Sequence, residues 1–361
     1  MNIERLDLQN FRRYSYTNLT FSPTLNILLG DNAEGKTTVL EALAMFSYGR
    51  SPRAKYEKEL IQFDQEQSQL RILLNRSGKH IDMAMKILNK GKQIKVNGAP
   101  KKNLSEFLGQ LHIVLFTPDD LSLIKLGPEE RRKFLNLNMG QFLHGFIDHL
   151  RRYNQLLLQR NSLLRMRQLG PLSVWDEQLS EAGALVLFER DKFVRDLTTY
   201  AANIYSILSS QRENLVLSYK TGLKGTTEKE YQEDLYRQLQ QSAINDVDRG
   251  YTTVGPHRDD LIFQIDGRSV VRFASQGQVR TAILALKFAL FDYITDKTNE
   301  LPVVLLDDVF SELDFSRQEH LLTRLHGAQT ILTTTNLEGR LKTSIHGKVF
   351  KIAHGIITDE G

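Results

Sequence analysis

The chain has 361 residues, of which 41% are hydrophobic and 25% charged, and its formal net charge is +4. This composition is typical of a folded protein long enough for two domains, and the mildly basic charge permits a nucleic-acid partner without requiring one. The sequence has no cysteine, which excludes disulfides, thiolate nucleophiles and Cys-based zinc sites. Its start, MNIERLDLQNF, carries charges where a signal peptide needs an apolar run, and no apolar run approaches 18 residues. We therefore expect a cytoplasmic protein without a membrane span.

Alternating apolar residues predict three short strands at the start of the chain, over residues 3–11, around Leu19 and over residues 25–30. After a loop, helical spacing begins at Lys36 and is closed by Gly49. Residues 69–102 return to short strands, with the turn sequences NKGK and NG between them.

The pattern changes near Pro118, because residues 119–245 are rich in Leu and Arg at helical spacing. After about Tyr251, the sequences LIFQI and VVRF predict strands on either side of a DG turn. A long helix, QVRTAILALKFALFDYI, and two strands, PVVLL and TILTT, follow. The simplest architecture is one α/β domain built from residues 1–118 and 251–361, with a mainly helical domain, residues 119–250, inserted between them.

The stretch GDNAEGKTT matches the phosphate-binding pattern G-x-x-x-x-G-K-[ST], with a predicted strand before it and a helix after it. Lys36 is expected to reach the β and γ phosphates, and the Thr37 hydroxyl to bind Mg²⁺. A glycine-rich turn with a capping threonine is the alternative. ATP is favoured by default, since NKGK lacks the Asp of a guanine-specific N-K-x-D motif. The expected ATP-binding residues are Gly30, Asp31, Asn32, Ala33, Glu34, Gly35, Lys36, Thr37 and Thr38.

Two adjacent carboxylates, Asp307 and Asp308, directly follow the apolar run of residues 303–306, which predicts a buried strand. Adjacent like charges at a strand end are costly to desolvate without a positive partner. Bound Mg²⁺ and Lys36 would supply that charge, with Asp307 on the metal side and Asp308 as general base for the attacking water. The alternative is that both acids only cap the next turn.

A third motif, FASQGQVRT, covers residues 273–281. Ser275 and Gln278 form an S-x-x-Q capping box for a helix that begins near Val279, which explains these two residues locally. The capping box does not explain Gly277, whereas a Ser, a Gly and a helix N-terminus together form an anion site. In a symmetric dimer, each subunit would offer this helix to the γ-phosphate bound by the other.

Together these motifs resemble the RecF family of bacterial recombination-repair ATPases, within the ABC-type class that includes the SMC proteins. The resemblance covers essentially the whole chain and is carried by NFRRY at residues 10–14, GDNAEGKTT, GPHRDDL at residues 255–261, SQGQVRT and LLDDVFSELD. It implies an α/β fold, with an ABC-type P-loop ATPase head formed by both termini and an inserted mainly helical domain.

The resemblance also implies a function in recombinational repair and replication restart. ATP binding would drive formation of a homodimer on double-stranded DNA and recruit RecR with RecO, and a weak, DNA-stimulated ATPase activity would release the complex. The class usually has Glu where Asp308 stands, and Asp is one methylene shorter, so we expect slow turnover.

By position, the resemblance assigns further roles to residues of this sequence. The assigned residues are Ser275, Gly277 and Gln278 as the signature that closes over the partner's ATP, Ser311, Glu312, Leu313 and Asp314 as the loop that communicates across the dimer, and Thr334, Thr335 and Arg12 as γ-phosphate sensors.

Basic residues cluster in two segments. Residues 75–103 hold eight Lys or Arg and one acid, and residues 149–175 hold five Arg and no acid. Both patterns suit contacts with a DNA backbone, whereas a sheet edge lined with Lys and a solvated helix face are the alternatives. The residues proposed to contact DNA are Arg53, Arg76, Lys79, Lys90, Lys92, Lys101, Lys102, Arg151 and Arg152.

Three other functions compete with this interpretation. A P-loop kinase acting on a small molecule explains the phosphate loop but leaves LLDDVFSELD and SQGQ unexplained. A transport-type ABC ATPase would need a longer signature motif and a membrane partner. An SMC-like clamp without useful turnover differs from the favoured function only in its rate of ATP hydrolysis. Two interpretations of GPHRDDL stay open: a structural cluster of ion pairs, or a role linked to nucleotide or DNA.

Overall fold

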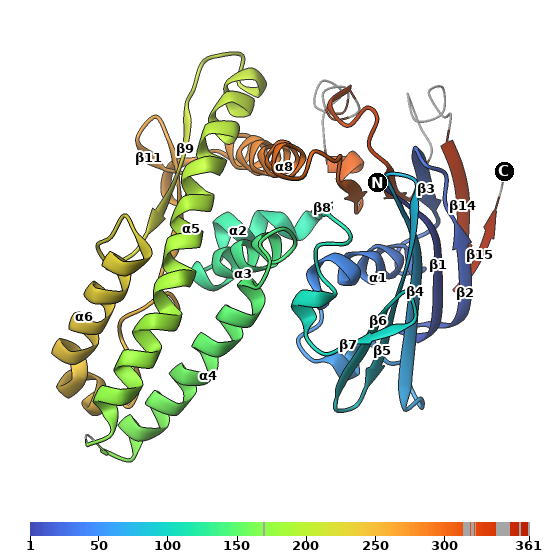
Figure 1. Cartoon of the computed structure of the whole chain (residues 1–361). Coiled ribbons are helices and arrows are strands. Elements are labelled where there is room, and N and C mark those ends of the chain that lie inside the picture. The colour runs from blue at the N-terminus through green and yellow to red at the C-terminus, as the bar shows by residue number, and fades with distance from the viewer. Residues whose placement is uncertain are drawn as a thin grey trace. The chain divides into compact units, whose positions relative to one another are not determined.

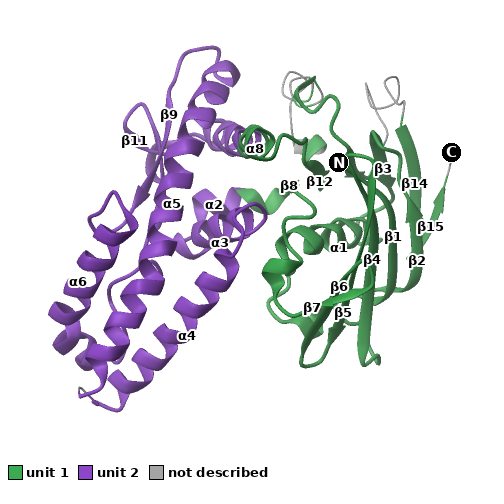
Figure 2. Cartoon of the chain, in the orientation of Figure 1, with its two compact units in different colours: residues 1–120, 290–361 green, residues 121–289 purple. Residues whose placement is uncertain are grey.

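The computed structural model describes residues 1–168, 170–312, 318, 321, 323–336, 347–353 and 355–359 (Figure 1). The chain divides into two compact units, one made of residues 1–120 and 290–361 and the other of residues 121–289 (Figure 2). The division falls within helix α8 (Gln276–Thr298). The first unit thus joins both ends of the chain, while the domain limits expected at residues 118 and 250 stay a prediction.

The first unit contains an antiparallel six-stranded sheet in the order β2-β1-β4-β5-β6-β7. Buried and exposed side chains alternate along its long strands, so one face packs on a core and the other faces solvent. Its strands are β1 (Asn2–Phe11), β2 (Tyr14–Thr20), β4 (Gln67–Arg76), β5 (Lys79–Leu88), β6 (Gly91–Val96) and β7 (Ala99–Lys101).

The second sheet of this unit has the order β15-β14-β3-β13-β12-β8 and is parallel except for β15. All four residues of β12 are buried, as expected for a parallel strand covered on both faces. Because these strands are parallel, the loops after β3, β12 and β13 leave the sheet at one edge. The strands are β3 (Leu25–Leu29), β8 (Ile113–Phe116), β12 (Val303–Leu306), β13 (Thr330–Thr334), β14 (Gly347–Ala353) and β15 (Ile356–Asp359).

Helix α1 (Lys36–Tyr48) starts directly after the phosphate loop, and Gly49, with φ of 70°, caps its C-terminus. Almost every residue of α1 is buried, so this helix is a central element of the unit. Its bounds confirm the helix predicted from Lys36 to Gly49. The unit also contains the short 3₁₀ helices η1 (Glu57–Leu60), η2 (Leu104–Glu106), η3 (Pro118–Leu121, which ends at the first residue of the other unit) and η4 (Val309–Glu312).

The second unit is mainly helical and carries a three-stranded antiparallel sheet in the order β11-β10-β9. The 37-residue helix α5 packs against α4, α6 and β9 (Figure 1). Besides α8, the elements are α2 (Ser122–Lys125), α3 (Pro128–Met139), α4 (Phe146–Arg165), α5 (Leu172–Leu208), β9 (Leu215–Lys220), α6 (Glu228–Arg249), β10 (Asp260–Ile265), β11 (Arg268–Ser269) and α7 (Val270–Phe273).

Two local predictions were wrong in this unit. The sequence VVRF, expected as a strand, is the short helix α7, because the hairpin pairing of β10 with β11 ends after Ser269. Conversely, β9 lies in a segment expected to be helical, where its pairing with β10 sets the strand conformation.

Candidate nucleotide site

The motif Gly30–Thr38 covers the loop after β3 and the first residues of α1, with the strand before it and the helix after it that the sequence predicted. Gly35 has φ of 108° at the N-cap of α1, and a Cβ there would come within 2.7 Å of the Tyr14 hydroxyl. At Gly30 a Cβ would meet the carbonyl oxygen of Ile352 at 2.3 Å. Glycine is therefore required at both ends of the loop, by backbone conformation and by close packing.

The Lys36 side chain folds back over the loop. Its Nζ donates to the carbonyl oxygens of Gly30 and Asp31, at 2.6 and 2.9 Å, and only 4% of the residue is exposed. Both acceptors are neutral, so the loop holds a positive charge at the N-terminal end of α1. This arrangement suits an anionic ligand such as a phosphate.

Asp307 joins the second motif to the phosphate loop. Its Oδ1 accepts hydrogen bonds from the Thr37 hydroxyl at 2.8 Å and from the Thr333 hydroxyl at 2.9 Å. Burial raises the pKa of Asp307 and the charge of Asp308 adds to this, whereas the two hydroxyls and the charge of Arg53 lower it. A hydroxyl beside a buried carboxylate is a donor set that Mg²⁺ prefers, so the residues fit this ion.

Asp308 lies two residues beyond the end of β12 and has a left-handed backbone conformation, φ 51°. Its N–H donates to the Thr333 hydroxyl at 2.9 Å. Such a conformation is uncommon for a residue other than Gly, Asn or Asp. Asp307 is buried and accepts two hydroxyls, whereas Asp308 is half-buried, so the two adjacent carboxylates occupy different environments, as two different roles would need.

Three residues at this site were not predicted from the sequence. The first is Thr333, whose hydroxyl donates to Asp307. The second is Arg13, whose guanidinium contacts the Ala33 carbonyl and lies 3.5 Å from the Glu34 carboxylate. The third is Tyr14, whose hydroxyl donates to the Gly35 carbonyl at 3.1 Å. Arg13 and Tyr14 belong to NFRRY, so that motif carried a signal for them. Thr333 had none beyond its place in TILTT.

The three residues expected to sense the γ-phosphate are placed differently from one another. Arg12 pairs through two nitrogens with Glu41 of α1, at 2.9 and 3.1 Å, and donates to the Glu59 carbonyl. The Thr334 hydroxyl donates to the Asn336 carbonyl at 2.9 Å, and Thr335 is exposed. Their proposed role stays a prediction.

The predicted capping box is present, although α8 begins at Gln276 and not near Val279, as had been expected. The Gln278 N–H donates to Ser275 Oγ at 3.2 Å, and the Ser275 N–H donates to Gln278 Oε1 at 2.8 Å. Gly277 is exposed, and a Cβ there would have only Ser275 Oγ within 4 Å, at 3.9 Å. Packing within the described chain thus does not require glycine at position 277.

The expected dimer loop is described only in part. Ser311 and Glu312 end the 3₁₀ helix η4, whereas Leu313 and Asp314 lie outside the described residues.

Several of the residues proposed to contact DNA are held by other groups. Arg76 bonds Glu300 at 2.7 Å and the Gly109 carbonyl at 2.8 Å, and Lys92 bonds Glu57 and the Gly49 carbonyl, each at 2.6 Å. On α4, Arg152 pairs with Glu181 at 3.2 Å and Arg151 with Asp148 at 3.9 Å. The exposed residues of the set include Lys79, Lys90, Lys102 and Arg53, and Lys101 is half-buried.

The solvent face of the antiparallel sheet has a depression of about 510 Å³ that the sequence did not reveal. Ala84 lies opposite Arg71 and Lys95 in the strand register, and its small side chain leaves the space between them. The lining holds four cations and one acid, Arg5, Arg71, Lys86, Lys95 and Asp7, together with Tyr16, which is 68% exposed. Arg5 pairs with Asp7 at 2.8 Å and Arg71 with Asp82 at 2.7 Å, so the net positive charge of this face comes from Lys86 and Lys95.

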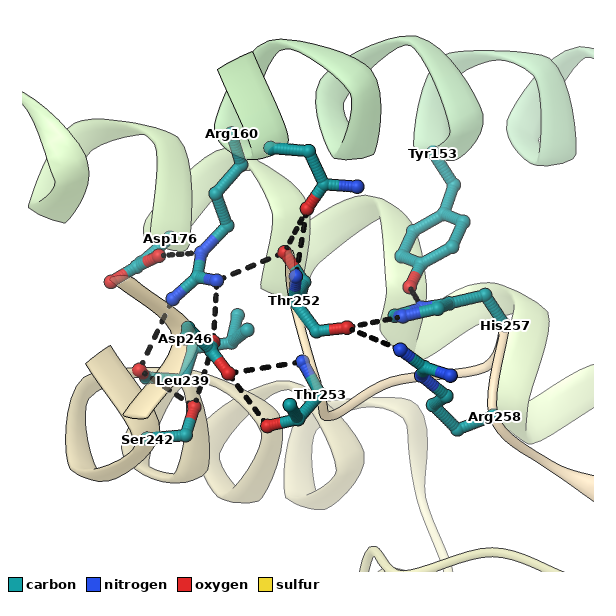
Figure 3. Close-up of polar contacts among 11 residues, drawn as sticks. Tyr153, Arg160, Asp176, Leu239, Ser242, Asp246, Thr252, Thr253, His257 and Arg258 are labelled. Atoms are coloured by element: carbon teal, nitrogen blue, oxygen red, sulfur yellow. Dashed lines mark hydrogen bonds and ion pairs between the residues drawn. The ribbon is translucent and has the colours of Figure 1, made fainter. Parts of the chain in front are cut away.

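The GPHRDDL motif lies in a network of buried polar contacts within the second unit (Figure 3). His257 Nε2 donates to the Thr252 carbonyl at 3.0 Å, so its Nδ1 accepts from the Tyr153 hydroxyl at 2.6 Å. The pKa of His257 is lowered to about 4, mainly by burial. Arg258 donates to the same Thr252 carbonyl at 3.2 Å, so this segment is fixed by its neighbours.

Beside it, the fully buried Arg160 bonds Asp176 at 2.6 Å, Asp246 at 2.7 Å and the Thr252 hydroxyl at 2.9 Å (Figure 3). These contacts tie α4, α5, α6 and the segment before β10 together. They favour the structural interpretation of GPHRDDL over a direct role in binding. Over the described ranges, no helix combines the length and the hydropathy needed to cross a bilayer.

Comparison with known proteins gives one consistent result. A family model described as "RecF/RecN/SMC N terminal domain" matches residues 2–357. The chain is 39% identical over 348 residues to the "DNA replication and repair protein RecF" of Listeria monocytogenes serotype 4b, a match that covers 94% of each chain. It is 40% identical to the RecF of Streptococcus thermophilus strain LMD-9, covering 100% of this chain and 99% of that one.

Solved structures agree. The "recombination mediator protein RecF-ATP in RecFOR pathway" matches with a TM-score of 0.91 and 34% identity, covering 99% of this chain and 97% of that one. An SMC head bound to the C-winged helix domain of ScpA matches with a TM-score of 0.55 and 16% identity, which shows a shared fold. The phosphate loop, the Asp307–Thr37 contact and the head formed by both termini are thus accounted for together, and the chain belongs to the RecF family.

Proposed function

We propose that the protein binds ATP with Mg²⁺ at the loop Gly30–Thr38, hydrolyses it slowly and uses the cycle in DNA repair. The observation that carries this proposal is the hydrogen bond between Thr37 and Asp307, which completes a nucleotide site from motifs 270 residues apart. Relatives described as RecF-ATP and as DNA replication and repair proteins support the same function.

Each residue then has a chemical role. Lys36 holds the β and γ phosphates, and the backbone N–H groups of the loop surround them. Thr37 and Asp307 hold Mg²⁺, which when bound would offset charge on the phosphate oxygens. Asp308 orients the attacking water and accepts its proton, so that ADP and phosphate are the products.

The signature is proposed to act between two subunits. Ser275, Gly277 and Gln278 stand at the exposed start of α8, and the space at Gly277 is not used by the described part of the same chain. A phosphate bound by a second subunit would fit against such a helix N-terminus. ATP binding would then favour a homodimer, and hydrolysis would return monomers.

Double-stranded DNA and RecR with RecO are the proposed partners, in line with relatives described in the RecFOR pathway. The basic depression on the antiparallel sheet is the surface we favour for the DNA backbone, since Lys86 and Lys95 lie on its solvent face. Stimulation of the ATPase activity by DNA and a cytoplasmic location stay predictions. A small-molecule kinase is not favoured, given the family membership.

Molar mass by light scattering tests the proposal. The Asp308→Asn protein keeps the nucleotide site but lacks the base, so its mass should double with Mg-ATP at one fixed concentration. Adding Ser275→Arg, which places a long side chain at the signature, should abolish the doubling. If the Asp308→Asn protein binds ATP yet stays monomeric, the proposal of a site shared between two subunits is wrong. Transfer of phosphate to a small acceptor would favour the kinase function instead.

A further inference from the structure

Gln278 is held from outside its own helix. Its Nε2 donates to Oε1 of Glu213 at 2.7 Å, and Glu213 lies in the loop between α5 and β9. The other carboxylate oxygen of Glu213 accepts from the Tyr205 hydroxyl at 2.7 Å. The Tyr205 side chain is fully buried near the end of α5, so it fixes Glu213 from the core side.

The loop that carries Glu213 is also fixed through its backbone. Ser210 and Gln211 both have left-handed conformations, φ 57° and 60°, which turn the chain sharply after α5. Asn214 exchanges two 3.0 Å hydrogen bonds with Asp266 at the tip of the β10–β11 hairpin. The carboxylate therefore reaches Gln278 from a rigid support and not from a mobile side chain.

A carboxylate decides which way the amide of Gln278 points. Glu213 only accepts hydrogen bonds, so the amide nitrogen of Gln278 has to face it. The amide oxygen then faces the Ser275 N–H, which it accepts at 2.8 Å. Ser275 Oγ accepts from the Gln278 N–H, so its hydroxyl proton can be donated to a further acceptor, such as a phosphate oxygen.

We infer that Glu213 is a positioning residue that orients the Ser275–Gln278 turn, so that the Ser275 hydroxyl and the start of α8 meet the phosphate bound by a second subunit. This inference rests on the proposed dimeric site and adds a residue that no motif contains. The helical unit would thereby set the donor geometry of the signature through the Tyr205–Glu213–Gln278 chain of hydrogen bonds.

Substitutions at Glu213 in the Asp308→Asn background test this role. Glu213→Ala removes the acceptor, whereas Glu213→Gln keeps an oxygen for Gln278, and its amide nitrogen can donate to the Tyr205 hydroxyl. With Mg-ATP, Glu213→Ala should raise the protein concentration at half-dimerisation about tenfold or more, the size expected when a hydrogen-bond donor loses its acceptor. Glu213→Gln should stay close to the parent, as should Arg212→Ala, an exposed neighbour in the same loop.

Binding of a fluorescent ATP analogue to the monomer provides the second readout, because a merely structural defect would lower it together with the melting temperature. We expect it to be unchanged in Glu213→Ala. If that variant does not fold, Tyr205→Phe combined with Glu213→Leu removes both hydrogen-bond partners and leaves no buried hydroxyl unpaired. The double variant should show the same dimerisation defect.

The outcomes separate the two proposals. If the Asp308→Asn parent stays monomeric with Mg-ATP, the dimeric site and the role of Glu213 fail together. A second outcome is that the parent dimerises, that Ser275→Arg prevents this, and that Glu213→Ala dimerises at the same protein concentration as the parent. In that case only the role of Glu213 is overturned.

Discussion

The Thr37 hydroxyl donates a 2.8 Å hydrogen bond to Oδ1 of Asp307, although the two residues lie 270 positions apart in the sequence. The parallel sheet brings them together, because β3 and β12 both pair with β13 and end at the same edge. Thr333 of β13 donates to the same oxygen, so the segments that follow β3 and β12 meet β13 at one carboxylate. The sheet order thus brings together the residues that we propose to hold Mg²⁺.

Asp307→Asn should separate metal binding from folding. Burial raises the pKa of Asp307, so its charge is disfavoured in the protein alone, and an amide oxygen can still accept from Thr37 and Thr333. We expect an unchanged or higher melting temperature without nucleotide. Ligand binding at 100 Kd stabilises a protein by about 2.7 kcal/mol in total, and the part of this ATP-dependent stabilisation that requires Mg²⁺ should disappear.

Thermal unfolding with ATP plus Mg²⁺ and with ATP plus EDTA measures this difference, and the unsubstituted protein is the control. An Asp307→Asn protein that keeps the full Mg²⁺-dependent shift would show that the ion is held elsewhere.

Asp308→Glu should raise the ATPase rate and lower stability. The longer side chain reaches further toward an attacking water, and we expect kcat to rise by roughly tenfold. The left-handed backbone at position 308 tolerates Asp better than Glu, so stability should fall by about 1 kcal/mol.

Asp308→Asn should lower kcat by roughly a hundredfold or more while ATP still binds. A steady-state rate of the unsubstituted protein comparable to that of a metabolic kinase would refute the assignment of slow turnover.

Local patterns made several features predictable. The phosphate loop, the helix that ends at Gly49 and the Ser275–Gln278 capping box all depend on residues a few positions apart, and the structure has each of them. The grouping of Asp307 with the phosphate loop followed from two motifs that both end buried strands.

Side-chain direction could not be predicted in the same way. Successive residues of a strand point to opposite faces, so Thr333 faces Asp307 while Thr334 turns to the Asn336 carbonyl. The contact of Thr333 with Asp307 depends on the register of β13 against β12, which no local pattern contains. Glu213 was missed for a related reason, since it lies in a loop without a motif and its partner Gln278 is 65 residues away along the chain.

His257 should make the protein less stable in mild acid. Its pKa is lowered to about 4 in the folded state, against about 6.5 in the unfolded chain, so protonation favours unfolding. The full stabilisation is present above pH 6.5 and is lost as the pH falls toward 4. At pH 5 the loss from this group should be roughly 2 kcal/mol relative to pH 7.5.

Urea unfolding at pH 7.5 and pH 5 tests this, with His257→Gln as the comparison. His112, whose pKa is also lowered to about 4, contributes equally to both proteins, so the difference isolates His257. If His257→Gln loses as much stability between the two pH values as the unsubstituted protein, the histidine does not carry the effect.

Substitution of single basic residues should distinguish DNA contacts from structural ones. Lys86 and Lys95 lie in the basic depression, whereas Arg76 is bound to Glu300 and the Gly109 carbonyl. Lys86→Ala and Lys95→Ala should each reduce the slope of log affinity for duplex DNA against log salt by about 0.9, as expected for one lost phosphate contact. Arg76→Ala should leave this slope unchanged and lower the melting temperature instead. Fluorescence anisotropy at a series of salt concentrations, with ATP present, measures the slope for all three variants. If the slope changes only for Arg76→Ala, DNA does not bind at this face of the sheet.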